Sequence, residues 1–391
     1  MKILFVTIFP PEIGGPSTQA AHLCEALKAR GHTPVVVAFD RRATFTDSHA
    51  GMRVHRILLP PSGKRTRSEG VLAYLRFARR LDRILAFERP DVVHCNSMGG
   101  YALIVGTLAR LRGIPTVVKF ASDLVWESLN RRGLTTGTIE ESHRAGLKAR
   151  ALSFYERITL RSFSRVWAAS EYRRKTLIGL LGVRPDRIRV VPNYVRLPEP
   201  LAGDPAENEG VSLLAGGRFV PHKRFQDLVS ALALLRDESV DLHLYGGGNP
   251  PLEERVLKRA AELGVADRVH HHGKVSDAEL LALHRAADIY VSTSVEEGFA
   301  ISVVEAMALG LPVIAVRKGA IPEVLPEGRA GLLFEPGDVQ GLADAIRRLA
   351  RDPDLRARYA AFGSDHARQY DLDRGVDEFT RLYEELVGAS A

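Results

Sequence analysis

The chain has 391 residues, of which 45% are hydrophobic and 26% charged; this is a globular composition that exceeds one ordinary domain and excludes a low-complexity chain. Its two cysteines, Cys24 and Cys95, exclude a disulfide framework and a cysteine-based metal site, and they favour a reducing compartment. Residues 1–200 carry 33 Lys and Arg against 16 Asp and Glu, a net charge of +17, whereas the remainder carries 21 against 31, a net charge of −10.

The first half of the chain alternates short apolar runs with helical patterns. Residues 3–8 form an apolar run that no small-residue cleavage site follows, so we predict a buried first strand rather than a signal peptide. A helical pattern over about 18–30 stops at Gly31, and a valine-rich strand pattern follows at 33–39. The later patterns in this half predict helices at 69–88 and 100–112 and strands at 92–95 and 115–120. Such alternation indicates a parallel sheet covered on both faces.

A linker and a second αβ pattern follow. Prolines and glycines gather at 196–210, which we predict to be the linker. The patterns after it predict strands at 211–215, 240–245, 269–272, 289–292 and 312–316, with helices at 225–236, 251–263 and 277–287. We therefore predict an α/β protein with two doubly wound halves. Because ligands of such sheets bind beyond the carboxyl ends of the strands, we expect a cleft site between the halves.

Two glycine-containing loops follow predicted strands. In the Gly14-Gly15-Pro16-Ser17-Thr18 loop, glycines would let backbone amides approach a phosphate, although a plain strand-to-helix turn explains the same residues. This loop is not a G-x-G-x-x-G motif, which argues against a nicotinamide-binding first half. In the segment 216–223, Arg218 and Lys223 lie five residues apart around a loop. An arginine fork and a lysine point charge together suit a diphosphate leaving group.

Two further segments extend the candidate site. Gly246 begins a run of three glycines directly after the strand predicted at 240–245, which suits close packing of a nucleotide or a plain turn. The segment 292–312 passes from a strand through an acidic turn into a helix predicted to begin near Phe299. Glu297 precedes that helix and Glu305 lies within it among apolar neighbours, so we expect these carboxylates to accept hydrogen bonds from sugar and ribose hydroxyls. Free amides at 299–302 would add donors.

These motifs resemble those of family four of the retaining GT-B glycosyltransferases. Glu297 and Glu305 are separated by seven residues, as in the E-x7-E motif of that family. Gly217–Lys223 is similar to its G-R-x-x-x-x-K motif, Val190–Asn193 to its V-I-P-N stretch, and Gly14-Gly15 to its double glycine. The resemblance spans nearly the whole chain. It implies the GT-B fold, with two Rossmann-like domains facing an interdomain cleft.

The resemblance also implies that the two domains bind different substrates. Residues 1–197 would form the acceptor-side domain and residues 208–372 the donor-binding domain, with a helix at about 373–391 packing back on the first. The donor would be a nucleotide sugar such as a UDP- or GDP-sugar, with no cofactor and no metal. The acceptor would be a carbohydrate or a lipid-linked precursor, as in polysaccharide or glycolipid biosynthesis.

Roles of single residues follow from the resemblance. Arg218 and Lys223 would hold the diphosphate, Glu305 the ribose, and Glu297 the transferred sugar. The predicted catalytic set is Asp123, Arg218, Lys223 and Glu297. The predicted donor-binding set is Gly15, Arg218, Lys223, Gly246, Lys274, Val275, Glu297, Phe299, Ala300, Ile301 and Glu305. In this set Gly15 would face the diphosphate, and the base would rest against residues 272–275.

The chain departs from the family pattern at several positions. Ser122 stands where the family often has the histidine of a His-Asp pair, and the surrounding text resembles a K-x-x-G-D-x-x-W-E branch. Asp123 is therefore the candidate acid of the cleft. Ala300 replaces a frequent glycine, and residues 193–196 replace an N-G-V-D stretch, which leaves hinge contacts to the donor open.

Other readings of the sequence remain open. A GT-B sugar-nucleotide epimerase or hydrolase, or a non-catalytic nucleotide-sugar binder, would share the motifs. The basic half could face an anionic membrane, or its charge could be scattered over the surface. The stretch 72–83 fits either a membrane-surface helix or a core helix with a basic outer face. We expect no nucleic-acid partner, because no aromatic-rich basic motif is present. Since no apolar run is long enough to cross a bilayer, we expect a cytoplasmic protein, soluble or peripheral at the inner face of the cell membrane.

A run of three histidines, His270–His272, suggests a metal site at first sight. Adjacent residues on a strand point to opposite faces, so three consecutive imidazoles do not converge easily. We therefore predict a strand that leads to the base-binding loop.

Overall fold

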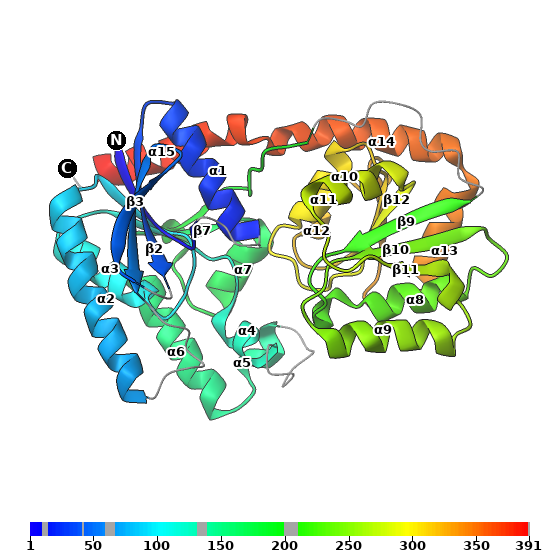
Figure 1. Cartoon of the computed structure of the whole chain (residues 1–391), viewed down its shortest axis with the longest axis horizontal. Coiled ribbons are helices and arrows are strands. Elements are labelled where there is room, and N and C mark those ends of the chain that lie inside the picture. Colours follow the sequence, from blue (N-terminus) through cyan, green and yellow to red (C-terminus); the bar gives the residue numbers. More distant parts are fainter. Residues whose placement is uncertain (10–14, 41–42, 59–66, 131–138, 199–209, 390–391) are drawn as a thin grey trace. The chain divides into compact units, whose positions relative to one another are not determined.

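The computed structural model of the chain describes residues 1–9, 15–40, 43–58, 67–130, 139–198 and 210–389. It divides into two compact units, one formed by Met1–Arg196 with Asp371–Ala391 and the other by Leu197–Tyr370 (Figure 1). Gly14 and most of the predicted linker lie outside the described residues. Each unit is built on a sheet of mainly parallel strands between helices, which confirms the predicted α/β fold class.

The first unit contains an eight-stranded sheet in the order β3-β4-β2-β1-β5-β6-β7-β8. Neighbouring strands are parallel except β3 and β4, which are antiparallel. The strands are β1 (Lys2–Val6), β2 (Thr33–Asp40), β3 (Phe45–His49), β4 (Met52–Leu58), β5 (Val92–Cys95), β6 (Thr116–Lys119), β7 (Arg165–Ala168) and β8 (Ile188–Val190). β5 and β6 are buried along their whole length, including the polar residues His94 and Lys119.

Helices cover both faces of this sheet. They are α1 (Gly15–Ala29), α2 (Arg67–Glu88), α3 (Ala102–Leu111), α4 (Leu124–Asn130), α5 (Ile139–His143), α6 (Leu147–Arg161), α7 (Glu171–Gly179) and α15 (Leu372–Gly388). One apolar cluster joins the sheet to α2, α3 and α6, and a second joins it to α1 and α15. The last helix therefore belongs to the core of the first unit. Phe379 of α15 packs edge-on against Trp167 of β7, with ring centroids 4.8 Å apart.

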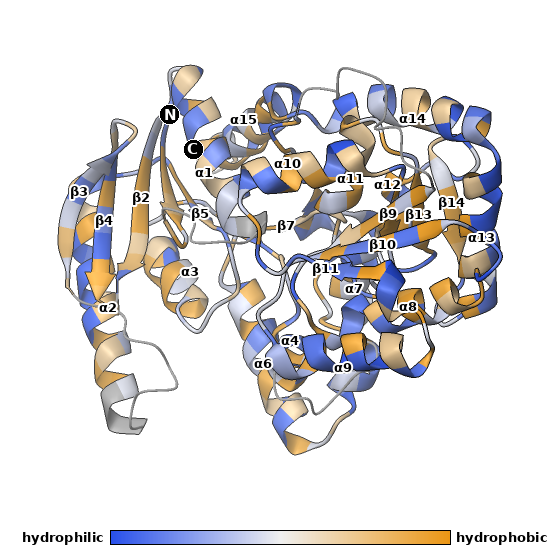
Figure 2. Ribbon diagram, turned by 45° about the vertical axis from the view of Figure 1, so that its right-hand side comes forward, coloured by the Kyte–Doolittle hydropathy of each residue, from blue (hydrophilic) through white to orange (hydrophobic). Residues whose placement is uncertain are grey.

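The second unit contains a six-stranded parallel sheet in the order β11-β10-β9-β12-β13-β14. Its strands are β9 (Val211–Gly216), β10 (Val240–Tyr245), β11 (Val269–His271), β12 (Ile289–Ser292), β13 (Val313–Val316) and β14 (Gly331–Phe334). Its helices are α8 (Phe225–Ala233), α9 (Pro250–Glu262), α10 (Asp277–Ala286), α11 (Ile301–Ala308), α12 (Ile321–Val324), α13 (Val339–Arg351) and α14 (Pro353–Ala367). In Figure 2 the strands of this sheet are largely orange, and the helices around it carry alternating orange and blue turns.

Among the described residues, no helix is both long enough and apolar enough to cross a membrane.

Candidate active site

Apart from Gly15, the predicted donor-binding residues gather at the carboxyl edge of the second sheet. β11, β10, β9 and β12 are consecutive in that sheet, so the loops that follow them are neighbours. Backbone hydrogen bonds join three of these loops: the amide of Gly217 donates to the carbonyl of Tyr245 (3.0 Å), and the amide of Gly246 donates to that of Gly273 (2.7 Å). The segments recognised separately in the sequence therefore form one continuous surface.

Gly246 shows why glycine is needed in these loops. Its φ of 102° is disfavoured for residues with a side chain. A Cβ atom at this position would overlap the carbonyl oxygen of Gly217 in the neighbouring loop. The two loops can approach this closely only because residue 246 has no side chain, which supports close backbone approach rather than a plain turn.

Lys223 and Glu297 form an ion pair at the centre of this edge. The Nζ atom of Lys223 lies 2.8 Å from Oε1 of Glu297, and both side chains are largely buried. Burial alone would lower the pKa of Lys223, but the charge and hydrogen bond of Glu297 outweigh it and raise the pKa. Burial would likewise raise the pKa of Glu297, yet Lys223 holds this pKa below its ordinary value. Both groups are therefore charged near neutral pH.

Arg218 lies on the same loop but is exposed. In the part of the chain that the structure describes, it forms no ion pair with a carboxylate. Its charge acts on Lys223, so the two cations lie within electrostatic range of each other. Phe219, which follows Arg218, is buried against Phe225 and His271 and anchors the loop. The guanidinium charge of Arg218 is thus not balanced by a carboxylate among the described residues, and the loop that carries Arg218 is anchored by Phe219.

Glu305 is the fifth of the eight residues of α11 and is partly buried. Burial, together with the charge of Asp277, raises its pKa to about 7. Its charge also acts on the phenols of Tyr245, the last residue of β10, and Tyr290, which lies within β12. A carboxyl group that is half-ionised near pH 7 changes its hydrogen-bonding capacity when a ligand donates to it.

Helix α11 begins at Ile301, two residues later than the sequence predicts. Ala300 precedes it in the left-handed conformation, with φ 63° and ψ 57°. This geometry favours glycine, and it accounts physically for the glycine that the family often has there. Phe299 is buried against Tyr370, with ring centroids 5.3 Å apart. The first amides of α11 have no carbonyl partner four residues earlier within the helix, so they are suited to donate hydrogen bonds to an anion or to a hydroxyl oxygen.

Lys274 and Val275 follow β11 at the same edge. Lys274 is exposed and Val275 is partly buried. Their loop is joined to the loop after β10 by the hydrogen bond that the amide of Gly246 donates to the carbonyl of Gly273. The histidine run alternates as predicted, because His271 contacts Phe219 on one face of the sheet. His270 and His272 lie on the other face and stack against His243 of β10.

Gly15 and Asp123 belong to the first unit. Helix α1 begins at Gly15, at the carboxyl end of β1. Asp123 is fully buried at the start of α4, where one carboxylate oxygen accepts a hydrogen bond from the amide of Trp126 (2.8 Å). The other oxygen lies 2.7 Å from Nε2 of His143. Asp123 therefore caps α4 and pairs with His143, and the contact with substrate expected for it stays a prediction.

His143 and Glu156 are two residues near Asp123 that sequence reasoning missed. Together with Asp123 they place potential metal-ligand atoms within 4.8 Å of one another. Ser153 completes a hydrogen-bonded chain, 2.8 Å from Nδ1 of His143. Burial and the charge of Asp123 raise the pKa of Glu156 well above its ordinary value. If Glu156 is neutral and Asp123 is paired with His143, the three side chains can lie this close together without a metal ion to balance their charge. The geometry therefore does not require a metal here. No sequence motif links α4, α5 and α6, so only the fold reveals this cluster.

Comparison with known proteins gives the family. The model of the glycosyl transferases group 1 matches residues 205–366, and that of the glycosyl transferase 4-like domain matches residues 14–194. A phosphatidyl-myo-inositol mannosyltransferase from Mycobacterium leprae (strain TN) is 28% identical over 95% of this chain and 93% of its own length. An MMP α-(1→4)-mannosyltransferase from Mycolicibacterium hassiacum is 32% identical over 71% of this chain and 66% of its own.

Solved structures share the fold over nearly the full length. A sucrose-phosphate synthase from Thermosynechococcus elongatus superimposes with a TM-score of 0.81 at 22% identity, covering 99% of both chains. HepE from Anabaena, in complex with UDP-glucose, superimposes with a TM-score of 0.75 at 21% identity, covering 99% of this chain and 100% of its own. The chain therefore belongs to family four of the GT-B glycosyltransferases and transfers a sugar from a nucleotide-sugar donor to an acceptor.

Proposed function

We propose that the chain is a retaining, metal-independent transferase whose UDP- or GDP-sugar donor binds at the carboxyl edge of the second sheet. The observation that carries this proposal is the Lys223–Glu297 pair with the exposed Arg218 beside it. Arg218 and Lys223 would bind the diphosphate and supply the positive charge that its departure requires. Glu305 would accept the ribose hydroxyls. The solved complex of HepE with UDP-glucose supports this choice of donor class.

The proposed reaction proceeds on one face of the sugar. The bond from the anomeric carbon to the diphosphate oxygen breaks, and a bond to the acceptor oxygen forms on the same face. The acceptor proton passes to the departing diphosphate, so no separate protein base is needed. Arg218 and Lys223 stabilise the negative charge that develops on the diphosphate. Glu297 orients the sugar, and its contact with Lys223 links sugar position to the phosphate charge.

Relatives that match nearly the whole chain suggest the acceptor class. One is named for phosphatidyl-myo-inositol, and D-inositol 3-phosphate glycosyltransferases from Acidothermus cellulolyticus and Saccharomonospora viridis are also similar to this chain. We propose a phosphorylated polyol, free or lipid-linked, as the acceptor of this chain. The basic first unit supports a negatively charged acceptor, because residues 1–200 carry a net charge of +17.

The test is transfer in the presence of EDTA. UDP- and GDP-sugars are incubated with D-inositol 3-phosphate, with phosphatidylinositol vesicles or with myo-inositol, and nucleoside diphosphate release is measured. We expect release that depends on a phosphorylated acceptor, with the anomeric configuration of the donor retained in the product by NMR. Inversion of the anomeric centre, or complete dependence on a divalent cation, would contradict the proposed mechanism. Release that is equal without any acceptor would instead indicate a hydrolase.

We further propose that the first unit binds an anionic membrane surface, which would place the enzyme at the inner face of the cell membrane. The support is a stripe on α6, where Leu147, Phe154 and Ile158 are exposed to 83%, 66% and 36%. Arg150 and Arg157 on the same helix are exposed as well. Exposed Leu72 and Leu75 of α2, near Arg76 and Arg79, make a similar pattern. Apolar side chains bordered by cations are typical of helices that lie in a membrane interface.

Vesicle co-sedimentation tests this second proposal. Phe154→Glu/Ile158→Glu should bind vesicles containing anionic lipid more weakly than the wild type, because it removes apolar contacts and adds negative charge. Leu111→Glu is the matched control, since Leu111 is 77% exposed on α3, away from the stripe. Each basic residue near the surface contributes about 1 kcal/mol at low salt, so binding should fall as salt rises. Equal sedimentation with neutral and anionic vesicles would rule out an electrostatic membrane contact.

A further inference from the structure

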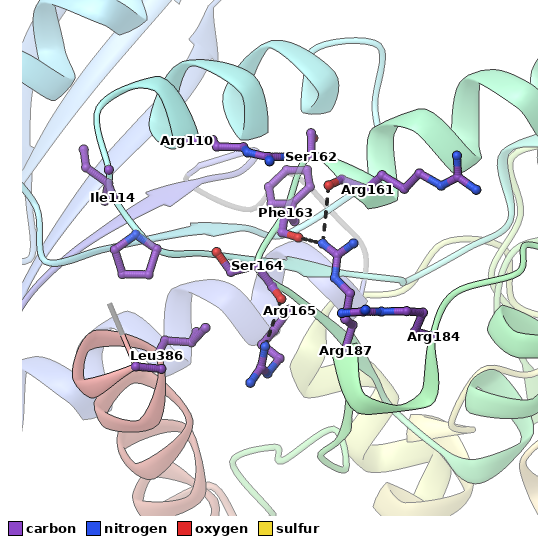
Figure 3. A pocket seen from close by; sticks show the side chains of 13 residues that line it. Arg110, Ile114, Arg161, Ser162, Phe163, Ser164, Arg165, Arg184, Arg187 and Leu386 are labelled. Carbon is purple, nitrogen blue, oxygen red and sulfur yellow. Dashed lines mark hydrogen bonds between the residues drawn. The ribbon is translucent and has the colours of Figure 1, made fainter. Parts of the chain in front are cut away.

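A pocket of about 480 Å³ lies at the amino edge of the first sheet (Figure 3). Pro115 and Ser164 line it, and they directly precede β6 and β7, while Arg184 and Arg187 precede β8. β6, β7 and β8 are parallel, so their amino ends share one edge of the sheet. Asp123 follows the carboxyl end of β6, at the opposite edge. The pocket is therefore separate from the part of the first unit to which the family motifs point.

Five arginines line this pocket: Arg110, Arg161, Arg165, Arg184 and Arg187. We propose that the pocket binds a small anion that carries two or more phosphate groups, at a site distinct from the transfer reaction. The proposal rests on the charge of the pocket, on the way its guanidinium groups are held, and on its size.

The positive charge of the pocket is not balanced by acidic side chains. Among the described residues, the ion pair between Arg184 and Asp186, at 3.1 Å, is the one that involves a pocket arginine. Burial lowers the pKa of Arg187, and the charges of Arg184, Arg110 and Arg165 lower it further, against an opposing effect of Asp186. Neighbouring cations therefore repel one another here, and a bound anion would relieve that repulsion.

A simpler account is that the arginines neutralise the carbonyl ends of helices. α3, α6 and α15 all end near the pocket, and a helix carboxyl end carries roughly half a negative charge. Three helix ends and Asp186 thus supply roughly two and a half negative charges against five guanidinium groups. Arg187 fits the simpler account, because it donates to the carbonyls of Phe163 and Arg161. The remaining positive charge still calls for an external anion.

The pocket also has the form of a small-molecule site. Its volume falls within the roughly 300–1,000 Å³ that is usual for ligand pockets. The bonds of Arg187 to backbone carbonyls fix its guanidinium, and Arg165 donates to the carbonyl of Ser164 at 3.2 Å. Figure 3 shows Arg184 and Arg187 lying close together on one side, with Ile114 and Leu386 on another. Arginine forks pair with phosphate oxygens in a bidentate manner, and a ligand with several phosphates can engage several forks at once.

Inorganic pyrophosphate is the probe for the test, measured by isothermal titration calorimetry. Arg110→Gln/Arg165→Gln removes two pocket charges without altering Arg187. Arg112→Gln/Arg174→Gln is the matched control, because it removes the same charge from two exposed or partly exposed arginines that do not line the pocket. We expect the pocket variant to bind pyrophosphate about 100-fold more weakly, roughly tenfold for each lost charged partner, and the control to bind like the wild type.

Arg218→Ala protein separates this proposal from the proposed donor site, since pyrophosphate could also bind there. Arg218→Ala protein should keep the part of pyrophosphate binding that is lost in Arg110→Gln/Arg165→Gln protein. Vesicles of phosphatidylcholine with or without a phosphorylated phosphatidylinositol identify the source of the anion. If only the wild type binds the phosphorylated vesicles and the pocket variant does not, the phosphates belong to a lipid head group. Equal pyrophosphate affinity of the pocket variant and its control, or no saturable binding by the wild type, would overturn the proposal.

Discussion

At the scale of single residues, Glu297 and Glu305 differ in ionisation despite their shared motif. Glu297 is held charged by Lys223, whereas burial together with the charge of Asp277 raises the pKa of Glu305 to about 7. The first carboxylate is therefore ionised and paired with an internal cation, whereas the second can take up or release a proton near pH 7. This difference supports separate roles, one toward the transferred sugar and the other toward the ribose.

We predict that nucleotide binding reports this difference. Glu305→Gln should weaken UDP or GDP binding, whereas Glu297→Gln should leave that affinity within about threefold and reduce transfer instead, roughly tenfold or more. Gln preserves the size of each side chain and its ability to hydrogen bond. Titration calorimetry and initial rates on the two variants check this. Equal loss of nucleotide affinity in both variants would refute the division of roles.

The raised pKa of Glu305 also predicts a pH dependence of nucleotide affinity. The free protein holds a proton on Glu305 below pH 7, and ribose hydroxyls favour the ionised form, so binding must release that proton. Affinity should therefore rise with pH up to about 7 and level off above it, by as much as about tenfold per pH unit. The phosphate of the ligand titrates in the same region. The Glu305→Gln variant shows the pH dependence that titration of the ligand phosphate causes. The difference between the affinity–pH profiles of the wild type and this variant is therefore due to Glu305.

At the scale of elements, the start of α11 carries local strain. Ala300 adopts the left-handed conformation with φ 63°, which costs roughly 1–2 kcal/mol for a residue with a Cβ atom. Glycine avoids this cost but loses more entropy on folding, by roughly 0.5–1 kcal/mol. The two effects oppose each other, and the conformational cost is the larger.

We predict that Ala300→Gly increases the free energy of unfolding of the second unit by up to about 1 kcal/mol. The measurement is urea denaturation, with the fluorescence or exchange of second-unit groups as the signal. Ala306→Gly in the interior of the same helix is the control, and it should destabilise the unit by at least about 1 kcal/mol. A loss of stability in Ala300→Gly similar to that of the control would show that residue 300 is not strained.

At the scale of the whole molecule, the last helix completes the core of the first unit. Tyr383 of α15 lies with its hydroxyl 2.6 Å from Nδ1 of His94 in β5. Burial, with a further effect from Lys119, lowers the pKa of His94 to about 3. The folded protein thus keeps His94 neutral at pH values where the unfolded chain, with an ordinary pKa near 6.5, takes up a proton.

We therefore predict that His94 makes the first unit sensitive to acid. As pH falls below about 6.5, proton uptake by the unfolded chain should lower the free energy of unfolding by up to about 1.4 kcal/mol per pH unit. His94→Gln should be less stable at pH 7, because it loses ring packing, yet its stability should change less between pH 7 and pH 5. Calorimetric melting at the two pH values tests this. An unchanged pH dependence in the variant would exclude His94 as the source.

The sequence predicts the central architecture well, for a physical reason. β5 and β12 are short, mainly apolar segments, β10 alternates apolar and polar residues, and the structure has all three with the predicted bounds. The hairpin of β3 and β4 was missed, because β3 is an edge strand with mostly exposed, polar residues and no apolar run. The cluster of His143 and Glu156 around Asp123 was missed because its members come from three helices. Local patterns reveal strands and loop motifs, whereas contacts between distant helices require the fold.

The most direct test of the account is nucleoside diphosphate binding to Arg218→Ala in the presence of EDTA. If Arg218 and Lys223 provide the charge that holds the diphosphate, wild-type protein should bind UDP or GDP without divalent cations. The loss of one charged partner costs roughly 1.5–3 kcal/mol, so Arg218→Ala should bind about 10- to 150-fold more weakly and lose a comparable factor in kcat/KM. Affinity that is the same in wild type and Arg218→Ala, or binding that needs a divalent cation, would contradict the account.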